Sequence, residues 1–144
     1  MTDQPATDQA TAERVVKGML ARDAFSEWLG IEALGIAPRR STLRMTVRKE
    51  MVNGFGVAHG GIVYALADSA LAFACNTHGT VTVALENSIS YPAPVNVGDV
   101  LTAQSSPEAE TNRIQFHRII VTNQNGVVVA IFRGTVYDTK RDHG

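Results

Sequence analysis

The chain has 144 residues, the usual length of one domain, and its 44% hydrophobic and 19% charged residues are typical of a globular protein. Its formal net charge of −1 offers no strongly basic surface, which argues against a nucleic-acid partner. The single cysteine excludes an intramolecular disulfide, and the polar N-terminus is not a signal peptide. We therefore expect a cytoplasmic protein without a membrane partner.

The polar segment 1–10 is predicted to be a disordered tail ahead of one domain over 11–144. In chain order, periodicity and turn signals predict a helix over 11–29, strands over 31–37 and 41–49, a loop over 50–59, a helix over 60–77, and strands over 81–91, 100–109, 113–123 and 127–137. The last strand is apolar on both faces, which predicts a central position in its sheet. This order indicates an α+β fold in which an antiparallel sheet wraps around one apolar helix, with an additional N-terminal helix.

One acidic residue interrupts the predicted buried helix. Between Ile62 and Cys75 the chain is almost wholly apolar, yet Asp68 lies near the middle, and no residue three or four positions away is basic. An unpaired carboxylate in such surroundings is destabilising unless its pKa rises until it is neutral. Asp68 therefore either lies at an exposed or interfacial edge, bonded to a loop, or faces a cleft and takes part in chemistry.

A histidine and two glycines open the same helix. Glycine at a helix start lets a ligand approach the backbone N–H groups, and the helix dipole makes that end attractive to a developing negative charge. On their own, His59, Gly60 and Gly61 are better explained as a tight turn with a capping or packing histidine. With a buried acid two turns later, an oxyanion site is the better interpretation.

The spacing within this helix predicts a dimer. Gly60 and Asp68 are eight residues apart. At about 1.5 Å of rise per residue they are separated by roughly 12 Å along the helix axis. A donor and a base must each come within about 3 Å of one reacting group, so one helix cannot supply both. Two antiparallel helices from two subunits can.

A resemblance to the hotdog-fold acyl-CoA thioesterases, most closely the phenylacetic acid degradation (PaaI-type) branch, is carried by the segment NGFGVAHGGIVYALADSALAFACN over 53–76. It extends to WLG at 28–30, ISYPAPVNVGD at 89–99 and VAIFRG at 129–134. The resemblance implies a hotdog fold, a sheet curled around one long central helix. It also implies dimers, often paired into tetramers.

The resemblance also implies roles for single residues. Asp68 would attack the thioester or activate water, and the Gly60 N–H would polarise the thioester carbonyl. Asn53 would position the water or the carboxylate, and His59 would orient the oxyanion loop. In related enzymes a hydroxyl residue in the strand after the helix helps to hold the water; by count, the equivalent position is Ala84, so the chain departs from the pattern there.

Three further residues are candidate contacts of the substrate. Gly61 adds a second amide at the helix start, Tyr91 closes a strand and could line an acyl or pantetheine channel, and Arg133 is one of several arginines that could meet the phosphates of coenzyme A. Packing or solvation explains Tyr91 and Arg133 equally well. The four histidines have no metal-ligand spacing, so we expect no metal, and coenzyme A enters as part of the substrate.

Three functions remain open from the sequence. The first is an acyl-CoA thioesterase acting on aryl-acetyl thioesters such as phenylacetyl-CoA or its ring-hydroxylated forms, as the resemblance implies. The second is a non-catalytic acyl-CoA-binding or sensing module on the same fold. The third is an enoyl-CoA hydratase or dehydratase, which would need a histidine and an acid facing the acyl chain. His59 and Asp68 do not provide that pair locally.

Overall fold

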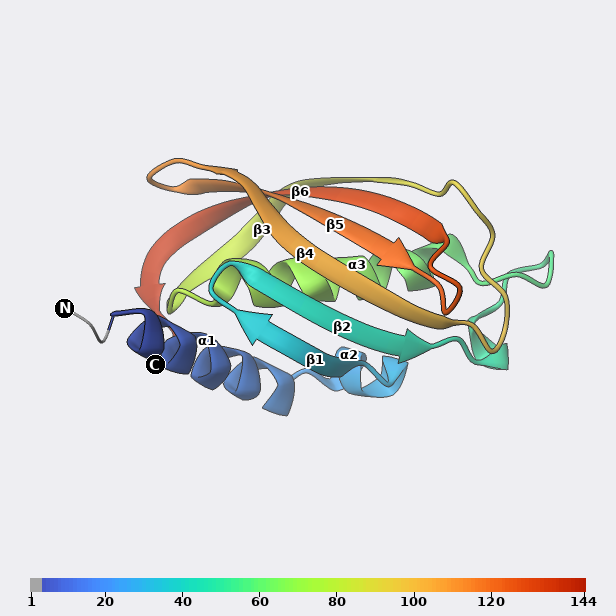
Figure 1. Ribbon diagram of the computed structural model, residues 1–144, viewed down its shortest axis with the longest axis horizontal. Helices are drawn as coiled ribbons and strands as arrows, with labels where there is room; N and C mark the ends of the chain where they lie inside the picture. Colours follow the sequence, from blue (N-terminus) through green and yellow to red (C-terminus); the bar gives the residue numbers. More distant parts are fainter. Residues whose placement is uncertain (1–3) are drawn as a thin grey trace.

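The computed structural model describes residues 4–144 (Figure 1). The helices and strands are α1 (Gln4–Ala21), α2 (Ala24–Leu29), β1 (Glu32–Ala37), β2 (Arg40–Thr46), the short 3₁₀ helix η1 (Lys49–Met51), α3 (Gly60–Asn76), β3 (Thr80–Ser90), β4 (Val100–Glu110), β5 (Ile114–Thr122) and β6 (Val128–Asp142). No helix within the described residues has both the length and the hydropathy needed to cross a membrane.

The strands of residues 4–144 form one six-stranded antiparallel sheet in the order β1-β2-β4-β5-β6-β3. The sheet curls around α3, while α1 runs past the edge strand β1 (Figure 1). The expected α+β architecture, a hotdog fold with an additional N-terminal helix, is therefore confirmed. β6, predicted to be central, pairs on both sides, with β5 and β3. It is the second strand from one edge of the sheet, because β3 forms that edge.

The N-terminal region differs from the sequence prediction in two ways. The helix expected over 11–29 is divided, because Asp23 caps a new helix: its Oδ1 accepts from the backbone N–H of Ser26 at 2.9 Å. Residues 4–10, assigned to a disordered tail, are the first turns of α1, and Gln9 Nε2 donates to the Ile36 carbonyl at 2.7 Å. Residues 1–3 of the tail lie outside the described residues.

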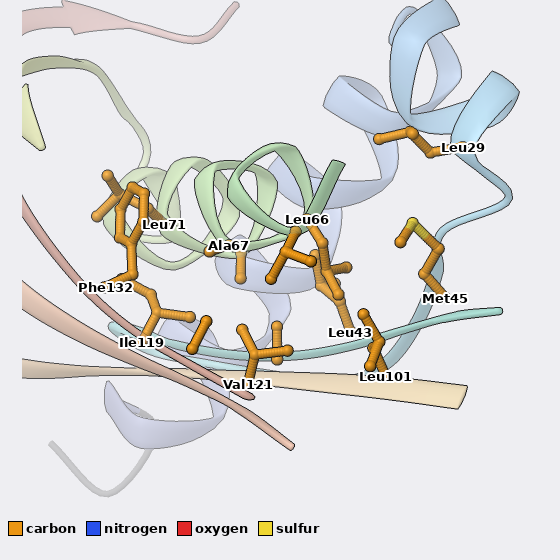
Figure 2. Close-up of a cluster of buried hydrophobic side chains, with 14 of the residues drawn as sticks. Leu29, Leu43, Met45, Leu66, Ala67, Leu71, Leu101, Ile119, Val121 and Phe132 are labelled. Carbon is orange, nitrogen blue, oxygen red and sulfur yellow. The ribbon is translucent and has the colours of Figure 1, made fainter. Parts of the chain in front are cut away.

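The core lies between α3 and the concave face of the sheet. Leu66, Ala67 and Leu71 of α3 are buried and point towards the strands, as Figure 2 shows. They meet side chains such as Ile119 and Phe132 from β5 and β6 (Figure 2). Burial of one such leucine stabilises the fold by about 1.5–3 kcal/mol. This packing fixes which side of α3 faces away from the sheet.

Two contacts position β3 and β6 against α3. At the end of the helix, Asn76 accepts from the Thr82 N–H at 2.8 Å and donates to the Thr82 carbonyl at 3.0 Å. On β6, a Cβ at Gly134 would overlap the side chain of Leu71 and lie 3.0 Å from Asn87 Oδ1. Glycine is therefore required at position 134 if α3 is to lie this close to the strands.

Acid sensitivity of the fold is expected from His117 on β5. The residue is 1% exposed, and burial, with a smaller effect of Arg39, lowers its pKa from 6.5 to about 4. Between about pH 4 and pH 6.5, the unfolded chain therefore binds a proton at His117 that the folded chain does not. The free energy of unfolding should fall as the pH drops from about 6.5 towards 4, by on the order of 3 kcal/mol for this residue.

Urea unfolding from pH 7 to pH 4 checks this expectation with wild type and His117→Leu. The pH slope should be reduced in the variant but not abolished, because burial also lowers the pKa of His78 and His143. Parallel pH curves for the two proteins would contradict the role assigned to His117.

Candidate active site

The start of α3 is capped by the histidine that precedes it. His59 has an extended backbone (φ −60°, ψ 134°), and its Nδ1 accepts from the Gly61 N–H at 2.9 Å. A Cβ at Gly61 would lie 3.0 Å from the same nitrogen, so glycine makes the cap possible. This bond occupies the amide of Gly61. Among the described residues the Gly60 N–H has no hydrogen-bond partner, which leaves it as an open donor at the positive end of the helix.

Tyr91 lies directly against Gly60. Its hydroxyl donates to the Gly60 carbonyl at 2.8 Å, and a Cβ on Gly60 would come within 3.2 Å of that hydroxyl. Both residues line a cavity of about 260 Å³ whose other walls are apolar, among them Val63 of α3 and Pro92. The structure thus brings Tyr91 to the helix start, and its contact with a substrate stays a prediction.

The loop that leads into His59 is held by its own backbone and by Asn53. Asn53 Oδ1 accepts from the Phe55 N–H at 2.9 Å, and the Asn53 N–H donates to the Val57 carbonyl at 2.8 Å. The His59 N–H donates to the Met51 carbonyl at 2.7 Å. Asn53 therefore shapes the turn before the helix, and the role implied for it next to the reacting group stays a prediction.

Asp68 lies two turns further along α3, on the side that meets β3. Its Oδ1 accepts from Asn87 Nδ2 at 3.2 Å, and the same nitrogen donates to the Tyr64 hydroxyl at 2.9 Å. Within residues 4–144 Asp68 forms no salt bridge. Partial burial raises the pKa of Asp68 above its ordinary value, and the bond from Asn87 lowers it in part. A half-buried acid without a cation is able to act as a base or nucleophile.

Sequence analysis did not identify Asn87 or Tyr64 as part of this site. A signal for Asn87 was present: the odd-numbered residues of β3 from Val81 to Ile89 are otherwise apolar. A polar residue in that series is as anomalous as the acid on α3. These odd-numbered residues do not all face α3, because the pairing register of β3 with β6 shifts between Ala84 and Glu86. Ala84 itself is exposed.

Arg133 lies apart from these residues. Its neighbour Gly134 faces α3, so the Arg133 side chain extends from the opposite face of the sheet. There it binds Glu108 through two hydrogen bonds of 3.0 and 2.7 Å. The structure does not bring Arg133 together with Asp68 or Gly60 in one chain.

An aromatic surface borders the helix start on the other side. Phe25 and Trp28 of α2 are stacked with ring centroids 6.0 Å apart, and they are 55% and 53% exposed. With His59, Gly61 and other residues they line an open cavity of about 330 Å³. Exposed aromatic side chains beside polar groups are characteristic of ligand sites.

Comparison with known proteins finds esterases and thioesterases as relatives of this chain. The profile of the thioesterase superfamily matches residues 55–130. Acyl-coenzyme A thioesterase PaaI of Escherichia coli is 35% identical over 116 residues, which cover 81% of this chain and 83% of that protein. A putative esterase of Archaeoglobus fulgidus is 34% identical over 130 residues, covering 90% and 84% of the two chains.

Solved structures agree with the sequence relatives. A structure of the E. coli PaaI protein from the phenylacetic acid degradation operon superimposes with a TM-score of 0.91 at 31% identity and covers 93% of this chain and 97% of that one. The TT0310 protein of Thermus thermophilus has a TM-score of 0.78 at 39% identity, covering 81% and 97%. The resemblance on which the sequence interpretation rested is therefore confirmed.

The burial of Asp68 predicts a stabilising substitution. Because the folded protein raises the pKa of Asp68 above that of the unfolded chain, ionising it works against folding at every pH above the acidic range. Asp68→Asn removes the charge at constant size. It should unfold at the same or a higher urea concentration than wild type at pH 7, and the difference should disappear below about pH 4. A clear loss of stability at pH 7 would contradict this description of the carboxylate.

Proposed function

Because the chain belongs to the thioesterase superfamily and is therefore a thioester hydrolase, we propose that it hydrolyses an aryl-acetyl-CoA to the free acid and coenzyme A. The observation that carries the proposal is the pair of groups on α3: a half-buried Asp68 without a cation, and an open amide at Gly60. Water is the second substrate. The reaction as proposed needs neither a metal nor a redox cofactor.

Asp68 supplies the nucleophilic half of the reaction. Its carboxylate either attacks the thioester carbonyl, forming an anhydride that water then cleaves, or removes a proton from the attacking water. In both routes the C–S bond breaks and the thiolate of coenzyme A leaves, taking up a proton. Partial burial favours both, since a poorly hydrated carboxylate is more basic than one in bulk water.

The Gly60 amide supplies the electrophilic half. As attack proceeds, the carbonyl oxygen gains negative charge, and a backbone N–H at the positive end of α3 stabilises that charge. His59 caps the helix through Gly61 and so keeps the Gly60 amide available. Tyr91 holds the Gly60 carbonyl, which fixes the orientation of the first peptide of the helix.

We place the complete site between two copies of the chain. Gly60 and Asp68 are separated by roughly 12 Å along one straight helix, so both reach one carbonyl only if a second α3 runs antiparallel to the first. The edge strand β3 exposes Val83 (45%) and Leu85 (60%), an apolar strip that a second copy would cover. The proposed assembly is a homodimer, or a dimer of such dimers, in the cytoplasm.

An aromatic acyl group fits the surroundings of the helix start. The exposed rings of Phe25 and Trp28 and the side chain of Ile62 line the cavity that reaches Gly61, and ring-on-ring contacts add to the burial of apolar area. The origin of the E. coli relative in a phenylacetic acid degradation operon supports the same class. We therefore propose phenylacetyl-CoA, or a ring-hydroxylated form, as substrate.

Release of free thiol tests the reaction. Purified protein incubated with phenylacetyl-, benzoyl- and straight-chain CoA thioesters and a thiol reagent should show the highest kcat/KM with phenylacetyl-CoA. Asp68→Asn and Asp68→Ala should lower kcat by roughly 10²–10⁴-fold, the usual contribution of a positioned base. Binding of acyl-CoA without thiol release would contradict the proposed function.

The oxyanion donor can be removed without deleting the helix start. Proline is favoured at the first position of a helix, and the extended backbone of His59 is the one that precedes proline. Gly60→Pro removes the N–H and should lower kcat on the order of 100-fold. Gly60→Ala is the matched control, because it introduces the same Cβ against Tyr91 but keeps the N–H. Equal activity in the two variants would exclude the amide as a donor.

Mixed oligomers test the shared site. Asp68→Asn and Gly60→Pro chains, each strongly impaired alone, are co-expressed with different tags. In a symmetric dimer that uses Asp68 of one chain and Gly60 of the other, each mixed dimer keeps one intact site, so random pairing should restore about a quarter of wild-type activity. No recovery, with mixed dimers demonstrated by tandem purification, would place both groups of each site in one chain.

A further inference from the structure

We propose that Asn87 of β3 is a positioning residue for Asp68: its side-chain amide orients the carboxylate and supports its ionised form. The proposal rests on the catalytic role proposed for Asp68. It extends that role to a second residue, on another element, that does not act on the substrate itself.

The geometry is a fork made by one amide nitrogen. Asn87 Nδ2 has two hydrogens, one bound to the Tyr64 hydroxyl at 2.9 Å and the other directed at Asp68 Oδ1 at 3.2 Å. Tyr64 is itself fixed, because its ring packs edge-on against Phe132 with centroids 5.1 Å apart. With one hydrogen anchored on Tyr64, the direction of the other is determined, and Asp68 Oδ1 lies along it.

The opposite side of the amide is closed. Asn87 Oδ1 is buried and has no hydrogen-bond partner within residues 4–144. It lies beside Gly134, where a Cβ would be 3.0 Å away, and the Leu71 side chain fills the rest of that space. A buried acceptor without a partner is unfavourable and calls for an explanation. Here the same amide directs its NH₂ group to an acid that, once ionised, is a hydrogen-bond acceptor only.

No charged group on α3 or β5 replaces this amide. On α3, burial raises the pKa of Cys75 to about 12, so its thiol is neutral, and Tyr64 is a phenol. On β5, His117 has a pKa of about 4 and is neutral above that pH, and Arg118 lies opposite Arg133 on the outer face of the sheet. Among the described residues, burial raises the pKa of Asp68 most, and the bond from Asn87 lowers it.

The other packed elements direct their charges elsewhere. On α2, Asp23 is bound to Ser26, whose hydroxyl lies 3.0 Å from that of Ser69 on α3. On β6, Arg133 is paired with Glu108 of β4 on the outer face of the sheet. Arg39 next to β2 is paired with Glu110 in the same way. Within residues 4–144, the side chain that donates to Asp68 is Asn87 of β3.

The test measures the pKa of Asp68 directly and through catalysis. The side-chain carboxyl carbon of Asp68, identified by its absence in Asp68→Asn, is titrated by ¹³C NMR, and the acid limb of kcat/KM is recorded with phenylacetyl-CoA. In Asn87→Leu, which is similar in size but has no donor, both should move to higher pH. kcat/KM at neutral pH should fall by roughly 10- to 100-fold, the value of a hydrogen bond to a charged group.

A second variant and a control complete the experiment. Asn87→Asp keeps the shape but sets a second carboxylate beside the first, so it should raise the pKa of Asp68 further than Asn87→Leu does. If Asn87→Leu does not fold, Asn87→Asp provides the titration that tests the proposal. Ser88→Ala, next in the chain but exposed on the other face of β3, should leave the titration and the acid limb unchanged.

An unchanged Asp68 titration in both Asn87 variants would overturn the proposal, even if they were less stable or less active at every pH. That result would make Asn87 a packing residue and leave the proposed function intact, because thiol release and its loss in Asp68→Asn are measured separately. Because the NMR titration needs no turnover, it decides the role of Asn87 even if wild type releases no thiol.

Discussion

A carboxylate on the most apolar helix of the fold is the constraint on which the site depends. α3 is held against the sheet by buried side chains such as Leu66 and Leu71, and Asp68 lies where water has only partial access. Its charge is therefore unfavourable unless donors are supplied. One donor, Asn87, comes from the strand that follows the helix, so the chemistry of α3 depends on how closely β3 and β6 are packed against it.

The geometry of the site relies on glycines at three close approaches. Gly60 leaves room for Tyr91, Gly61 for the ring of His59, and Gly134 for Leu71 and Asn87. In each case a Cβ would meet a neighbouring side chain at 3.2 Å or less. The first two shape the start of α3, where an amide is open, and the third sets the distance between the helix and the strand that carries Asn87. Conformational entropy lost at these glycines is offset by the contacts they permit.

The straightness of α3 separates the two halves of the proposed chemistry. A helix rises about 1.5 Å per residue, so its dipole end and an acid two turns later cannot meet on one small group. The proposed dimer resolves this by antiparallel pairing. The same edge strand that would pair with a second copy exposes Val83 and Leu85 and directs Asn87 inward, so β3 would serve assembly and site at once.

Much of the fold was already determined by the sequence. The alternation of apolar and polar residues, the turn glycines and the apolar run from Ile62 to Cys75 predicted an antiparallel sheet around one helix, because these periodicities are local properties of the chain. Two boundaries were wrong, one for a local reason and one for a tertiary reason. Asp23 caps a new helix that divides the segment 11–29, and residues 4–10 extend α1, where tertiary contacts such as that of Gln9 with Ile36 outweigh weak local signals.

Some residues of the candidate site are recognisable from the sequence, and others join it only in the folded structure. Asp68, His59, Gly60 and Gly61 are recognisable from sequence because they break a local pattern or begin a helix. Asn87 became part of the site only in the folded structure, since it reaches Asp68 and Tyr64 through the register between β3 and β6 and the approach of α3 at Gly134. Arg133 lies on the outer face of the sheet, because successive side chains of β6 point to opposite faces and its neighbour Gly134 faces α3. Sequence determines which residues are anomalous within one element, whereas contacts between elements depend on packing distances that no local pattern encodes.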